Sequence, residues 1–124
     1  MGASPHHSAM SPEMQACIAN CLDCFAKCET CATHCIGHIA SEAEMIPCVK
    51  ACLDCAATCK TCVTLMHYES PLHAKMCGVC ADACATCAAE CEKHAAHDDP
   101  CRVCAEACRK CEQSCRRMSH VTAS

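Results

Sequence analysis

The segment CIANCLDCFAKCETCATHC, residues 17–35, carries a cysteine at every third or fourth position. This spacing keeps the thiols on one face of an α-helix, the face along which helices pack in a bundle. Leucine and isoleucine normally occupy such a face. The segment therefore predicts a helix whose buried surface is made of sulfur.

Three more segments repeat the pattern, and the four stripes together contain all 21 cysteines of the chain. The stripes are Cys17, Cys21, Cys24, Cys28, Cys31 and Cys35; Cys48, Cys52, Cys55, Cys59 and Cys62; Cys77, Cys80, Cys84, Cys87 and Cys91; and Cys101, Cys104, Cys108, Cys111 and Cys115. Short connections make successive helices antiparallel. We expect an all-α protein, an up-down-up-down antiparallel four-helix bundle with a cysteine-lined core.

Capping signals indicate where the helices begin. Ser11, Ser70 and Asp99 each stand before a proline, a combination typical of a first helical turn. The predicted helices span about 11–39, 42–68, 70–95 and 99–118. They make one domain at 11–118, between a flexible N-terminal tail at 1–10 and a C-terminal tail at 119–124.

The second helix carries two conflicting signals. Ser41 with Glu44 resembles a capping box. Pro47 would then lie more than one turn inside the helix, where proline removes a hydrogen bond. We expect this helix to start late or to bend at the proline.

The composition excludes several classes of protein. So many cysteines are typical of a secreted disulfide scaffold, but such scaffolds are rich in loops and their cysteine spacing is irregular. The N-terminal residues MGASPHHSAMSPEM show no basic region followed by an apolar run, so we expect a cytoplasmic protein with reduced thiols. No apolar run is long enough to cross a membrane. A net charge of −4, with only Phe25 and Tyr68 as aromatics, also makes nucleic acid an unsuitable partner.

A soft metal gives a reason for filling a core with thiols. Residues four apart on a helix have Cβ atoms about 5–6 Å apart, and a linear sulfur–metal–sulfur unit spans roughly 4.5 Å. Nine C-x-x-x-C pairs therefore suit Cu(I). One Cu(I) per displaced thiol proton leaves the core neutral, whereas Zn(II) in four-cysteine sites would leave it at roughly −10. Many Cu(I) ions are therefore the predicted cargo.

Two alternatives belong to other classes. One is a metallothionein-like buffer for zinc or cadmium, and the other is a thiol redox reservoir, which would need exposed cysteines of low pKa. No nucleophile with a base and an orienting group is discernible, so we expect a protein that is not an enzyme.

If each stripe is extended by three or four residues at either end, the next position is a methionine or a histidine. In an antiparallel bundle these residues gather at two ends. The Met end comprises Met14, Met66, His73 and Met118, and the His end comprises His38, Met45, His94 and His97. Taken singly, each residue is better explained as a gap-filling methionine or a solvent-facing histidine. Taken together, they are possible metal ligands at the bundle ends that would capture Cu(I) and pass it to the core.

A second, apolar stripe lies beside the thiols on the first two predicted helices. It comprises Ile18, Leu22, Phe25, Ala32, Ile36, Val49, Leu53, Ala56 and Val63. Packing between these two helices and a subunit interface are both compatible with this pattern.

From about Met14 to Met118 the chain resembles the bacterial copper storage proteins, and their cytosolic branch in particular. The resemblance rests on the four helices with C-x-x-x-C and C-x-x-C repeats, including the CLDC segments at 21–24 and 52–55. It implies a bundle that stores many Cu(I) ions on inward-facing thiolates, protects the cytosol against copper, loads through an open end and forms a homotetramer. A copper chaperone is a possible partner. We favour loading at the His end, because two histidines of one connection converge there.

Overall fold

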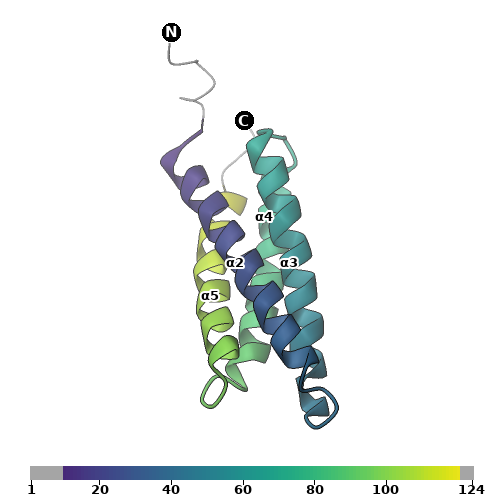
Figure 1. Ribbon diagram of the computed structural model, residues 1–124. Helices are drawn as coiled ribbons and strands as arrows, with labels where there is room; N and C mark the ends of the chain where they lie inside the picture. The colour runs from purple at the N-terminus through teal and green to yellow at the C-terminus, as the bar shows by residue number, and fades with distance from the viewer. Residues whose placement is uncertain (1–9, 121–124) are drawn as a thin grey trace.

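The computed structural model describes residues 10–120 of the chain. In that range the chain forms α2 (Pro12–Ile36), the 3₁₀ turn η1 (Ala43–Met45), α3 (Ile46–His67), α4 (His73–Glu92) and α5 (Asp99–Ser119). Figure 1 shows an antiparallel bundle, with the α2–α3 and α4–α5 connections at one end and the α3–α4 connection at the other. The predicted all-α, up-down-up-down bundle is confirmed.

The helices form a closed ring around one core. Each helix packs on two neighbours, so that α2 and α4 both contact α3 and α5. All 21 cysteines lie inside with no exposed surface. Met45 and Met66 are the largest fully buried side chains among residues 10–120, and nearly all the others are cysteines and alanines, so the core is built almost entirely of small groups.

Side-chain caps begin the first and the last helix. The Ser11 hydroxyl accepts the Met14 N–H at 3.1 Å, which confirms the predicted start of α2. The predicted cap at Asp99 is wrong by one residue. Asp98 has the extended backbone that a cap needs, and its carboxylate accepts the Cys101 N–H at 3.0 Å.

Ser70 does not cap α4, contrary to the prediction. Its hydroxyl accepts the Leu72 N–H within the turn, and the helix begins only at His73. The preceding helix explains the difference. Glu69 takes a left-handed conformation with φ of 51°, and the Ser70 N–H reaches back to the Leu65 carbonyl at 2.9 Å. This C-terminal capping motif uses Ser70, the residue at which the prediction began the third helix.

The capping box predicted for the second helix is also absent. The Ser41 hydroxyl donates to the His38 carbonyl at 3.3 Å instead. Pro47 stands in the first turn of α3, where its missing N–H leaves no bond unmade. The late start of this helix is therefore the correct alternative.

The apolar stripe divides between packing and surface. Its small and β-branched members are buried between α2 and α3: Ile18, Ala32, Val49, Ala56 and Val63. By contrast, about half of the side-chain surface of Leu22, Ile36 and Leu53 is exposed. The stripe thus packs the two helices together and also leaves an apolar outer surface. Among residues 10–120, no helix has the length and apolar character needed to cross a membrane.

Candidate metal centre

The antiparallel register arranges the thiols in five layers, each with one cysteine from every helix. From the Met end to the His end the layers are Cys17, Cys62, Cys77 and Cys115; Cys21, Cys59, Cys80 and Cys111; Cys24, Cys55, Cys84 and Cys108; Cys28, Cys52, Cys87 and Cys104; and Cys31, Cys48, Cys91 and Cys101. Cys35 lies beyond the last layer. We call this arrangement the thiol column.

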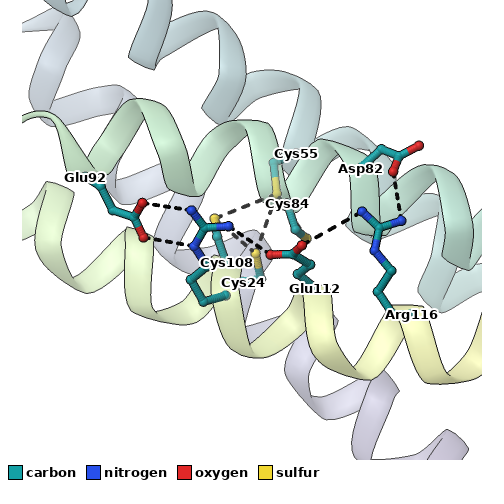
Figure 2. A network of polar contacts seen from close by, with 9 residues as sticks. Cys24, Cys55, Asp82, Cys84, Glu92, Cys108, Glu112 and Arg116 are labelled. Carbon is teal, nitrogen blue, oxygen red and sulfur yellow. Dashed lines mark hydrogen bonds and ion pairs between the residues drawn. The ribbon is translucent and has the colours of Figure 1, made fainter.

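Sulfur atoms meet both across and along the column. In the middle layer, Cys55 Sγ lies 3.6 Å from the Sγ atoms of Cys24 and Cys84 and 4.0 Å from that of Cys108. Cys28 Sγ joins this layer to the next, at 3.8 Å from Cys108 Sγ. Contacts also cross the diagonals of the bundle, which places the sulfurs on its axis (Figure 2).

These distances alter the expected geometry of a metal site. Only four of the nine C-x-x-x-C pairs have Sγ atoms in contact, at 3.9–4.0 Å. Most contacts instead join different helices. With metal–sulfur bonds of about 2.3 Å, the sulfurs of a trigonal site lie about 4.0 Å apart and those of a linear site about 4.5 Å. The resting column therefore has the spacing of trigonal thiolate sites, and linear sites need a small outward movement of the thiols.

Several sets of four sulfurs could each surround one ion. In each set the Sγ atoms all lie within 4.8 Å of one another, as for Cys21, Cys59, Cys80 and Cys111. Cys21 and Cys80 also belong to a second set, with Cys62 and Cys115. Because neighbouring sets share members, the thiols can bridge ions into clusters.

Burial favours the protonated form of two thiols at the His end of the column, Cys35 and Cys101. It is the main cause that raises the pKa of Cys35 to about 11, and the nearby Cys48 thiol raises it further. Burial likewise raises the pKa of Cys101, with a smaller contribution from Cys31. The charged thiolate is disfavoured in both cases because it loses hydration and faces other sulfurs. A metal ion that enters here has to displace protons.

Ion pairs cover the outside of the column where α4 meets α5. Arg109 of α5 holds Glu92 of α4 through two hydrogen bonds of 2.8 and 2.9 Å, and Arg116 holds Asp82 at 2.8 Å (Figure 2). Glu112 lies between the two arginines. The hydrogen bonds from Arg109 lower the pKa of Glu92. All of these groups are in contact with water, so they fix the register of the two helices more than they stabilise the fold.

At the His end, most of the predicted ligands are accessible to solvent. His38 and His97 are exposed, His94 is half-buried, and only Met45 is fully buried, at 2% exposed. The His94 and His97 rings lie 6.4 Å apart, in the connection between α4 and α5. The sequence correctly predicted that these two histidines lie close together. It gave no indication of how exposed they are.

A contact that the sequence did not predict fixes a further histidine at this end. His34 Nε2 lies 2.9 Å from Asp98, the cap of α5, and so joins α2 to α5. Burial favours a higher pKa for Asp98, but hydrogen bonds from the Cys101 N–H and from His34 outweigh it and lower that pKa. His34 is therefore engaged in structure.

The Met end is closed. Met14, Met66 and Met118 are 8%, 0% and 2% exposed, and the partly buried Met10 and Met76 pack against the core. His73, the fourth predicted member, has both ring nitrogens buried. The two ends therefore differ in access as well as in chemistry.

The fold and the site together define a four-helix bundle whose core is a column of free thiols. Residues 10–120 match the family model Csp, copper storage protein. The chain therefore belongs to the copper storage protein family.

Solved structures agree with this assignment. The chain is 36% identical to the Cu(I)-bound copper storage protein BsCsp3, with a TM-score of 0.81 over 86% of this chain and 98% of that one. It is 37% identical to apo Csp3 from Bacillus subtilis, with a TM-score of 0.76 and coverage of 85% and 97%. A cytosolic copper storage protein from Streptomyces lividans with five coppers is 34% identical, with a TM-score of 0.81 and coverage of 88% and 93%. Comparison with curated protein sequences gives no match.

Proposed function

We propose that the chain stores many Cu(I) ions on the thiolates of its column and so protects the cytosol against copper. The observation that carries the proposal is the column itself, in which 21 free, fully buried thiols lie at the spacing of bridged thiolate sites. All 21 cysteines are proposed ligands. Cu(I) is a soft ion that accepts two or three thiolates, and each Cu(I) replaces one proton, so the core stays neutral as it fills.

Anaerobic titration of the reduced protein tests this function. We expect binding to continue to roughly one Cu(I) per thiol, and the apo protein to be helical by circular dichroism before any metal is added. Zn(II) should stop at about one ion per four thiols. Saturation by Cu(I) after about one or two equivalents would overturn the proposal. A preference for Zn(II) over Cu(I) in competition would favour the alternative of a zinc or cadmium buffer.

Storage needs no catalysis, and we propose that the chain is not an enzyme. The thiols are fully buried, whereas redox catalysis needs accessible cysteines. The similar storage protein from Streptomyces lividans is cytosolic, which supports a cytoplasmic location for this one. A homotetramer remains a prediction from the family resemblance. The exposed apolar surface at Leu22, Ile36 and Leu53 is a candidate for its interface. A copper chaperone remains a possible source of the metal.

We further propose that copper enters at the His end, where His94 and His97 are accessible. The double variant His94→Ala/His97→Ala should load several-fold more slowly and reach an unchanged capacity, because it loses weak capturing ligands and no thiols. Stopped-flow transfer from a Cu(I)–chelator complex measures the rate. The variant His67→Ala/His120→Ala is a matched control, since these two histidines are also exposed but lie at the other end. Equal rates for the two double variants would exclude capture by His94 and His97.

A further inference from the structure

The Met end contains a set of soft ligands that the thiol column does not use. Each of the four helices supplies one member, namely Met14, Met66, His73 and Met118. These residues lie one helical step beyond the outermost thiol layer, in which Cys62 and Cys77 Sγ are 3.3 Å apart and Cys17 and Cys115 Sγ are 3.7 Å apart. They therefore occupy the position of a sixth layer.

The glycine at position 78 shows how α4 and α5 lie at this end. A Cβ atom placed on Gly78 would lie 3.7 Å from the Cβ atom of Ser119. The beginning of α4 therefore runs directly beside the last turn of α5, the turn that carries Met118. Met66 on α3 has no exposed surface, which is the burial expected of a residue in the middle of such a layer.

His73 is in an unfavourable environment unless it has a ligand. Its two ring nitrogens are the only side-chain nitrogen or oxygen atoms within residues 10–120 that are buried and have no hydrogen-bond partner. The His73 side chain as a whole is half-buried, but a ring nitrogen that is buried without a partner loses its hydration and gains nothing in return. The methionine sulfurs of the same layer would be at best weak acceptors for it. A bound cation would satisfy the nitrogen lone pair and would use the thioethers at the same time.

We propose that Met14, Met66, His73 and Met118 form one further Cu(I) site, with an imidazole nitrogen and thioether sulfurs as ligands. Both donor types suit Cu(I). Unlike thiolates they carry no charge, so this site should bind more weakly than the column and fill after it. The inference rests on the proposed storage function, to which it adds a low-affinity site of different chemistry at the closed end.

The test uses the full chain with ¹³C-labelled methionine methyl groups, titrated anaerobically with Cu(I) and followed by NMR. The Met14, Met66 and Met118 methyl signals should shift late, after the thiols are filled, and a weak Cu(I) chelator should reverse these shifts first. The variant His73→Leu keeps every thiol and should lose the late shifts together with about one ion of capacity. His67→Leu, an exposed histidine at the same end, is the matched control and should behave like the wild type.

A second readout separates a ligand from a structural residue. Because His73→Leu removes two unpartnered buried nitrogens, it should raise the unfolding temperature of the apo protein, whereas loss of a structural histidine would lower it. If His73→Leu does not fold, the nearly volume-conserving variant Met66→Leu/Met118→Leu provides the same test. Full loading of the thiols without late methyl shifts would overturn the extra site and leave storage intact. Early saturation of the wild type would instead count against storage.

Discussion

Filling the column with Cu(I) should raise the midpoint of thermal unfolding by about 20 °C or more. A site filled at 1,000 times its dissociation constant adds about 4 kcal/mol, several sites act together, and 1 kcal/mol moves the midpoint by about 2–8 °C in domains of this size range. The apo core has few strong stabilising contacts of its own, so the free energy of metal binding is a large addition. Its interior is mainly cysteine and alanine, and none of its cysteines is in a disulfide.

Differential scanning calorimetry of the apo and loaded protein under anaerobic conditions measures the shift. Removal of the copper with a strong chelator should return the midpoint to the apo value, which shows that the gain comes from bound metal. Equal midpoints for the apo and loaded forms would mean that the thiolates do not hold the four helices together through the metal.

Removal of the middle layer should reduce the capacity and also divide the column. The variant Cys24→Ala/Cys55→Ala/Cys84→Ala/Cys108→Ala leaves two thiol layers toward the Met end and two layers plus Cys35 toward the His end. Adjacent layers are about 5 Å apart along a helix, so the gap becomes about 10 Å. We expect the capacity to fall by about four ions or more. The half beyond the gap should load at least about tenfold more slowly, because an ion can no longer pass directly from one thiolate to the next.

A matched control removes the same number of thiols without opening a gap. In Cys17→Ala/Cys62→Ala/Cys77→Ala/Cys115→Ala the lost layer is the last one before the Met end, so the remaining column is continuous from the His end. It should lose a similar capacity and load at the normal rate. Circular dichroism checks that both variants remain helical. If the two variants load equally fast, ions reach the layers through the sides of the bundle.

The sequence was sufficient to predict the fold and the identity of the buried residues. Each stripe repeats at the helical period, so every cysteine was assigned to the core and is fully buried there. Helix limits were harder, because caps depend on backbone conformation. Asp98 and Asp99 are equally suitable in chemistry, and only Asp98 has the extended backbone. The sequence likewise gave no signal of the positive φ at Glu69, since glycine normally occupies such a position.

Less of the candidate site could be predicted. The periodicity of one helix gives the spacing of its own thiols, but it contains no information on the distance between helices. The contacts between Cys55 and the thiols of three other helices were therefore not foreseen. An antiparallel alignment of the four stripes would have revealed the layers. The bond between His34 and Asp98 and the closure of the Met end depend on how the connections fold over the bundle, which no stripe encodes.

The closed ring of helices has a consequence for protein engineering. α5 packs on α2 and runs antiparallel to it, so the end of α5 and the start of α2 lie at the same end of the bundle as the α3–α4 connection (Figure 1). A circular permutant that begins at α4 and joins α5 to α2 through a short linker would keep all five layers. Its only cut would fall in the exposed turn around Glu69. The thiol column is thus a property of the ring of helices and does not depend on where the chain begins.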